Sequence, residues 1–137
     1  MFPFAAIWDT GASASAISQK VVDQCGLLPT GVVQAQTAAG LAQTETYMVN
    51  IGLANGVQFA IIKVSKANLG AANDVLIGMD VISQGDFSIT NENGNTVFSF
   101  RVPSAHTVDF VKQHNEAAMR DRIAKAGRGG FRGGKKK

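Results

Sequence analysis

The sequence predicts an all-β domain, a small closed or folded sheet of short strands with one or two short helices. A C-terminal helix and a disordered basic tail follow it. Three observations support this prediction: short apolar runs separated by close turns, a helical period that starts only near Thr107, and a last stretch rich in Gly, Arg and Lys. With 137 residues, 45% of them hydrophobic, the chain can form one domain with a modest core. This pattern is not that of a parallel α/β domain.

Strands are predicted where apolar runs end at turn residues. The first covers residues 4–8 and the second residues 14–17. Ser18 is the expected N-cap of a short helix that runs to Cys25, with Gly26 as its stop. The dipeptides Asn-Gly at 55–56 and 93–94 predict hairpin turns. The remaining strands are expected at residues 32–37, 44–53, 57–65, 75–77, 87–90 and 96–100, with one or two helical turns at residues 79–83.

Charge divides the chain into an acidic body and a basic end. Residues 120–137 carry eight Lys or Arg against one Asp, a net of +7, which leaves residues 1–119 at −4. The last eleven residues cannot bury enough apolar surface to offset the entropy of ordering them. We therefore expect a domain at residues 1–104, a helix at residues 105–126 and a disordered tail at residues 127–137.

The sequence predicts neither a cofactor nor a metal, and a cytoplasmic protein without a membrane segment. Cys25 is the one cysteine, which excludes an intrachain disulfide and a Cys-rich zinc site. His106 and His114 stand at no metal-ligand spacing, and no stretch approaches the roughly 18 apolar residues of a membrane helix. Three acids that could suggest a cation site are expected to make local hydrogen bonds instead: Asp74, Asp80 and Asp86.

The first chemical motif is Asp9-Thr10-Gly11, which ends an apolar strand. Its carboxylate is expected at a buried edge, and Gly11 permits a backbone that turns N–H groups toward it. The hydroxyls of Thr10 and Ser13 could hold this geometry. Taken alone, these residues equally suit a plain turn.

The second motif is Leu76-Ile77-Gly78 followed by Asp80. By itself it predicts a buried strand that runs into a short helix, with Gly78 allowing close packing. Together, and in this order, the two motifs resemble the catalytic loop and the hydrophobic-hydrophobic-glycine motif of the retropepsin-like (retroviral-type) aspartic protease family. The resemblance covers roughly residues 4–102 and is nearest to the prokaryotic members.

The resemblance implies a closed acid-protease β-barrel and a role for each matching residue. Asp9 matches the catalytic aspartate, Thr10 the residue whose hydroxyl bonds across a dimer, and Gly11 a backbone donor to the carboxylates. Ala12 and Ser13 match supporting positions. The flap that closes over a bound peptide matches Ala38, Ala39, Gly40 and Leu41, and the structural motif matches Leu76, Ile77, Gly78 and Asp80.

A single Asp-Thr-Gly implies a homodimer, because hydrolysis by this class needs two carboxylates around one water. The predicted function is an aspartic endopeptidase acting on peptides or proteins through an Asp9 from each of two chains. An inactive peptide- or protein-binding module on the same fold is the alternative, because a fold does not guarantee its function. Eight residues before Asp9 are fewer than the family usually has, which favours that alternative. The Arg-Gly-Gly tail is either a weak RNA-binding segment or a solvated end.

Overall fold

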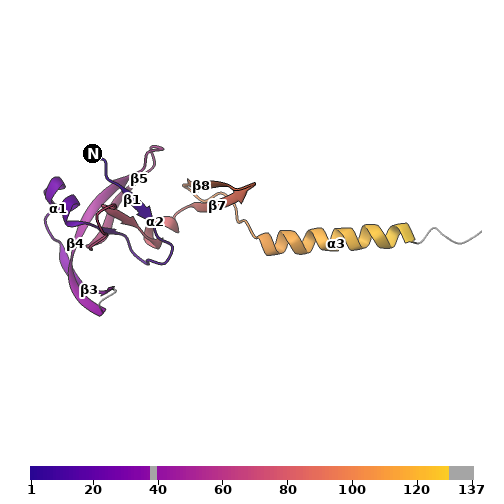
Figure 1. Ribbon diagram of the computed structural model, residues 1–137, viewed down its shortest axis with the longest axis horizontal. Coiled ribbons are helices and arrows are strands. Elements are labelled where there is room, and N and C mark those ends of the chain that lie inside the picture. Colours follow the sequence, from indigo (N-terminus) through magenta and orange to yellow (C-terminus); the bar gives the residue numbers. More distant parts are fainter. Residues whose placement is uncertain (38–39, 130–137) are drawn as a thin grey trace, which may run out of the picture. The chain divides into compact units, whose positions relative to one another are not determined.

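A computed structural model of the chain describes residues 1–37 and 40–129. The chain divides into two compact units, Met1–Ala105 and His106–Lys137. The first unit holds all the strands and the two short helices, and the second holds one long helix (Figure 1).

The first unit confirms the predicted strand-rich domain with two short helices. Its elements are β1 (Ala6–Trp8), β2 (Ala16–Ile17), α1 (Gln19–Cys25), β3 (Gly31–Thr37), β4 (Gly40–Gly52), β5 (Gln58–Lys66), β6 (Val75–Ile77), α2 (Met79–Ile82), β7 (Asp86–Glu92) and β8 (Asn95–Arg101). Helix α1 stops as predicted, because Gly26 adopts a left-handed φ of 59°. Ser18 stands at the N-cap position, but its side chain makes no capping hydrogen bond.

Among the residues described, six strands form one mixed sheet in the order β1-β6-β2-β5-β4-β3, and β7 and β8 form a separate two-stranded sheet. Strand β1 runs parallel to β6, which places Trp8 beside Ile77 at the end of both strands. The described residues show no closed barrel, which differs from the prediction. Strands β1 and β3 are the two edges, and β1 and β2 have only three and two residues, so they offer too little ladder to close the sheet.

The β3–β4 hairpin is longer than predicted. The register runs to Thr37 opposite Gly40, so the part of the expected tip at residues 40–43 belongs to β4. Ala38 and Ala39 lie outside the described residues. Strand β5 pairs with β4 only from Thr46 onward. The earlier part of β4 therefore pairs with β3 alone, and this end of the hairpin extends past β5.

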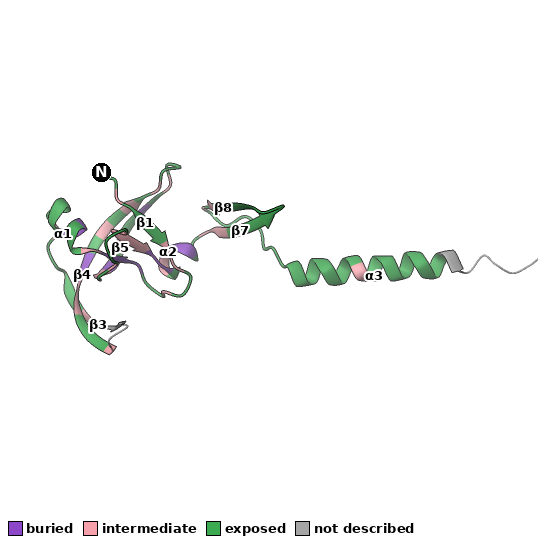
Figure 2. Cartoon of the chain, in the orientation of Figure 1, coloured by how far each residue is buried: buried purple, intermediate pink, exposed green. Residues whose placement is uncertain are grey.

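The core of the first unit consists of two hydrophobic clusters. The buried residues, purple in Figure 2, lie in this unit. One is formed under α1 around Ile17 and Val64, which are 2% and 1% exposed. The other joins Phe59, Ile77 and Val81 beneath the end of β6. Because Ile77 belongs to this second cluster, the end of β6 is packed against the hydrophobic core.

Strand β5 contains a strained residue, Ile61, at a bulge opposite Asn50. Ile61 has a φ of 58°, its N–H donates to Asn50 Oδ1 at 2.9 Å, and its side chain is 71% exposed. A β-branched residue in the left-handed region costs about 1–2 kcal/mol.

We therefore expect Ile61→Asn to raise the free energy of unfolding by about 1 kcal/mol, because Asn tolerates this conformation and no buried contact is lost. Urea unfolding measures the change. Val32→Asn is the control: Val32 is 62% exposed and is not among the residues with positive φ. Equal losses of stability in both variants would contradict the expected strain.

The carboxylate of Asp86, at the start of β7, accepts hydrogen bonds from the chain segment that follows β8. Ser104 Oγ donates to Asp86 Oδ1 at 2.5 Å, and the Ala105 N–H donates to Oδ2 at 2.9 Å. The Arg101 guanidinium pairs with the same carboxylate. These groups, the Ser104 hydroxyl first, hold the pKa of Asp86 well below its usual range.

A lowered pKa makes Asp86 a source of acid sensitivity. Its contribution to stability is present above the pKa of the unfolded chain, about 3.9, and is lost as pH falls toward the folded-state value. Asp86→Asn should therefore be less stable than wild type at pH 7 and should lose less stability on acidification from pH 5 to 2. Thermal melts across that range test this, and parallel curves for the two proteins would contradict it.

The second unit contains helix α3 (Phe110–Gly129). Asp109 Oδ1 accepts the Lys112 N–H at 2.9 Å and so caps the helix. Almost every described side chain of this helix is exposed (Figure 2). The helix runs on through residues 127–129, where the predicted tail begins, and residues 130–137 lie outside the description. Among the described helices, none combines the length and the apolar character needed to cross a membrane.

Candidate active site

Asp9 lies at the point where β1 ends beside β6. Its backbone N–H donates to Ile77 O at 2.9 Å, so the strand pairing continues to the aspartate itself. The residue is half-buried. Asp9 thus follows the end of the strand, as expected, but the edge where it lies is only partly buried.

The loop after Asp9 turns back on the carboxylate. The Gly11 N–H donates to Asp9 Oδ1 at 2.8 Å, and the Ala12 N–H donates to Asp9 O at 3.3 Å. A side chain at Gly11 would place its Cβ 3.2 Å from Asp9 Oδ1. Glycine at this position therefore lets the backbone donor approach the carboxylate closely, as expected.

Gly78 lies directly against this loop. A Cβ on Gly78 would stand 2.7 Å from Ala14 C and 3.0 Å from Ala12 O, and the next residue, Met79, donates its N–H to Ala12 O at 2.8 Å. The two predicted motifs, far apart in sequence, thus meet in space. Leu76 pairs with Ala16 of β2 as well as with β1, so it belongs to the sheet beneath the loop.

The buried, hydrogen-bonded hydroxyl of this loop is that of Ser15, a residue that the sequence analysis did not single out. Ser15 is 0% exposed, and its Oγ donates to Asp80 Oδ1 at 2.7 Å. Ser13, the predicted candidate, is exposed and makes no hydrogen bond within the described residues. The one signal in the sequence was a small polar residue placed just before the buried pair at residues 16–17.

Trp8, the residue before Asp9, packs against three aromatic rings. Its ring lies 4.9 Å from the ring of Phe100, 5.3 Å from that of Phe98 and 5.8 Å from that of Phe87, all tilted. Tilted aromatic contacts at these distances contribute about 0.5–1.5 kcal/mol each beyond burial. The β7–β8 hairpin is therefore packed onto the residue that precedes Asp9.

The predicted flap lies on the β3–β4 hairpin. Leu41 is 71% exposed and Gly40 has a φ of 111°, a backbone that favours glycine. Near the point where β5 begins to pair with β4, Lys66 forms an ion pair with Glu45, and the hydrogen bond from Lys66 lowers the pKa of Glu45. Tyr47 donates to the same carboxylate at 2.9 Å. These contacts hold the base of the hairpin in place.

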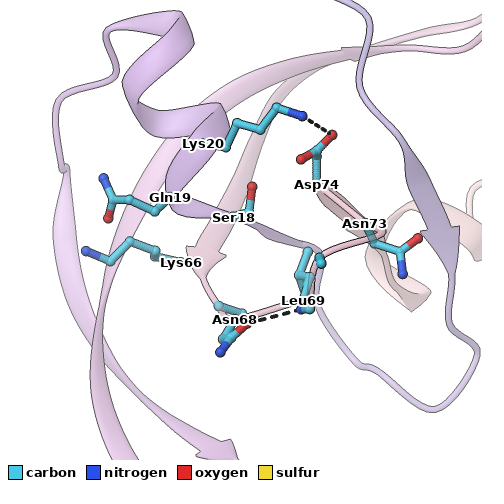
Figure 3. A pocket seen from close by; sticks show the side chains of 11 residues that line it. Ser18, Gln19, Lys20, Lys66, Asn68, Leu69, Asn73 and Asp74 are labelled. Atoms are coloured by element: carbon cyan, nitrogen blue, oxygen red, sulfur yellow. Dashed lines mark hydrogen bonds and ion pairs between the residues drawn. The ribbon is translucent and has the colours of Figure 1, made fainter.

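A cavity of about 520 Å³ lies elsewhere, between the start of α1 and the loop before β6 (Figure 3). Lys20 and Asp74 pair across it at 3.0 Å, and Asn68 Oδ1 accepts the Gly70 N–H at 3.1 Å. Asp74 immediately precedes β6, whereas Asp9 adjoins the end of that strand at Ile77. The cavity contains none of the predicted site residues and is not the candidate active site.

Asp74, Asp80 and Asp86 each make hydrogen bonds, but most of their partners are distant in sequence rather than local as predicted: they lie 69, 65 and 18 positions away for Ala5, Ser15 and Ser104. Asp74 accepts from Lys20 and from the Ala5 N–H, and Asp80 and Asp86 accept from the partners named above. Among the residues described, no three His, Cys, Asp or Glu form a group that could hold a metal ion.

Comparison with known proteins identifies the family. The profile of the gag-polyprotein putative aspartyl protease family matches residues 2–84, more than half of the chain. The chain therefore belongs to this family of aspartyl proteases, as its two motifs predicted. No curated protein matches.

One similar solved structure is a retropepsin-like aspartic protease from Rickettsia conorii. The match has 22% sequence identity and a TM-score of 0.45, and it covers 61% of this chain. It spans 64% of the Rickettsia chain, less than two thirds of its length.

Proposed function

We propose that this protein is an aspartic endopeptidase whose active site contains Asp9 from each of two identical chains. The observation that supports this most is the geometry of one loop. Asp9 follows β1 directly, with its carboxylate held by the Gly11 N–H at 2.8 Å, inside the segment that matches the family.

The chemistry follows from two carboxylates around one water. An ionised carboxylate accepts a proton as the water attacks the peptide carbonyl. The protonated carboxylate donates a hydrogen bond to the carbonyl oxygen, where negative charge develops. Two carboxylates about 3 Å apart cannot both ionise, so they share one proton and titrate as a pair.

One chain brings a single Asp-Thr-Gly, so the proposal includes a homodimer. Several residues close to Asp9 are exposed in the single chain. Ile7, on the strand edge, is 44% exposed, and Ile89 and Phe98 of the hairpin packed on Trp8 are 62% and 44% exposed. The Thr10 hydroxyl makes no hydrogen bond within the described residues, which suits its proposed role across the dimer. A second chain would cover this surface.

The proposed substrate is an extended peptide or protein segment bound under the flap at residues 38–41. Digestion of a diverse peptide mixture from about pH 4 to 7, read by mass spectrometry with Asp9→Asn alongside, tests the proposal. Cleavage that is lost in the variant supports it. A folded, dimeric protein that cleaves nothing would instead favour the peptide- or protein-binding module.

We also propose weak RNA binding by the basic end of the chain. The proposed segment is the tail at residues 127–137, which carries five Lys or Arg and no acidic residue. Such binding should weaken steeply with salt, because contacts to phosphates release counterions. Deleting residues 127–137 should abolish it in a fluorescence-anisotropy assay with single-stranded RNA, and unchanged affinity would exclude the tail. The cytoplasmic location stays a prediction from the sequence.

A further inference from the structure

Ser15 has the most completely buried side chain of the loop that carries Asp9. Its exposure is 0%, and its hydroxyl uses both hydrogen-bonding directions. Ser15 Oγ donates to Asp80 Oδ1 at 2.7 Å and accepts the Gly78 N–H at 3.0 Å. Its backbone N–H donates to Asp80 Oδ2 at 3.0 Å. Ser15 is therefore held through two separate donors by one carboxylate.

Asp80 in turn is tied to its own helix. Its Oδ1 also accepts the Val81 N–H at 3.0 Å, and its backbone O accepts from the Gln84 side chain at 2.9 Å. Val81 is 0% exposed in the second hydrophobic cluster. The carboxylate that holds Ser15 thus rests on a packed part of the core and has little freedom to move.

The loop is attached to the residues around Gly78 at three points. Asp9 N–H donates to Ile77 O, Met79 N–H donates to Ala12 O, and Ser15 bonds to Asp80. All three partners lie within four consecutive residues, at the junction of β6 and α2. The first bond fixes the start of the loop, the second its middle and the third its end.

On the outer side of the loop, side-chain packing adds little to the support that these hydrogen bonds provide. Residues 10, 11, 13 and 14 are exposed, and Ala12 is half-buried. Loss of the Ser15 hydroxyl would leave the buried Gly78 N–H without its acceptor. The pairing of Ala16 with Leu76 does not involve that hydroxyl, so β2 would remain in the sheet. The expected consequence is a loop that shifts within an otherwise intact domain.

We propose that Ser15 and Asp80 are positioning residues for Asp9: their hydrogen bonds set the place of its carboxylate relative to the second carboxylate and the substrate. The proposal rests on the proposed protease function. A misplacement of about 1 Å is enough to lower a rate by about 100-fold. The effect belongs to the chemical step, because the two side chains bond to each other and to the N–H groups of Gly78 and Val81, and none of these partners lies on the flap.

The test compares Ser15→Ala, Asp80→Asn and the double variant in the full-length protein. Each single variant should lower kcat by about 100-fold with KM changed less than about threefold, and the double variant should do no worse, since the pair acts as a unit. Val22→Ala is the control. Val22 is 8% exposed in the core cluster under α1, so its truncation destabilises the domain without touching the loop. It should keep its kcat below its melting temperature.

Amide hydrogen exchange provides a readout that does not depend on activity. In Ser15→Ala the amides of Asp9, Gly11 and Ala12 should exchange faster by about tenfold or more, whereas those of the β4–β5 ladder should not change. Three results would overturn the positioning role. The first is a double variant whose loss of kcat is the sum of the two single losses, and the second is a loss of kcat no larger than that of Val22→Ala at equal stability. The third is unchanged amide exchange in the loop. If wild type shows no Asp9-dependent cleavage, the proposed protease function fails, and the exchange data alone decide whether this pair holds the loop.

Discussion

Asp9→Asn is expected to abolish peptide cleavage and to leave the fold and the dimer intact. Asn has the shape of Asp, and its amide oxygen can accept the Gly11 N–H that Asp9 Oδ1 accepts at 2.8 Å. The Asn amide can neither take a proton from the attacking water nor hold the proton that the two carboxylates share, so both roles of the dyad are lost. Loss of a general base costs about 100- to 10,000-fold in rate. Because Asp9 is only half-buried, the melting temperature should change little.

The matched control for this prediction is Asp23→Asn, which removes an equal charge from an exposed acid on α1. It should retain full activity. Mixing wild type with an excess of Asp9→Asn should inhibit cleavage in proportion to the fraction of mixed dimers, because each active site would then contain one Asn. Undiminished activity in that mixture would show that a single chain contains the complete site, and the two-chain dyad would be wrong.

Local signals in the sequence predicted much of this fold because they report local conformation. The turn at Asn93-Gly94 is an example. Both residues adopt a positive φ, 51° and 79°, which is what a tight hairpin turn requires and what few other residues tolerate. Gly26 ended α1 for the same reason. In these places the backbone has few choices, so the residue type decides the structure.

Features that depend on pairing across the chain were predicted less well. Whether the sheet closes depends on how many residues β1 and β2 contribute to the ladder, and no single residue determines the length of a strand. The bond between Ser15 and Asp80 joins residues separated by 65 positions. Neither residue is unusual in its own segment, so the pair becomes visible only when β6 and β2 lie side by side.

Gly78 shows how a weak local signal acquires meaning from the fold. Its φ of −95° is accessible to any residue, so conformation alone does not require glycine there. The requirement comes from the loop above it, where a Cβ would stand 2.7 Å from Ala14 C and 2.8 Å from Ala14 O. Both are backbone atoms, and Met79 and Ser15 hold this part of the loop on either side.

Gly78→Ala is therefore expected to lower the free energy of unfolding by about 2–3 kcal/mol, since overpacking against atoms that cannot move aside costs about this much. It should also lower kcat, because relief of the clash must lift the Asp9 loop. Urea unfolding and peptide cleavage measure the two effects. Gly127→Ala is the control: its new methyl group would meet no atom within 4 Å beyond its own stretch of helix, and it sits in α3, where Ala favours the helix by about 1 kcal/mol over Gly. If Gly78→Ala were as stable and active as wild type, the loop could not rest against the β6–α2 junction, and the attachment of Asp9 to that junction would be wrong as well.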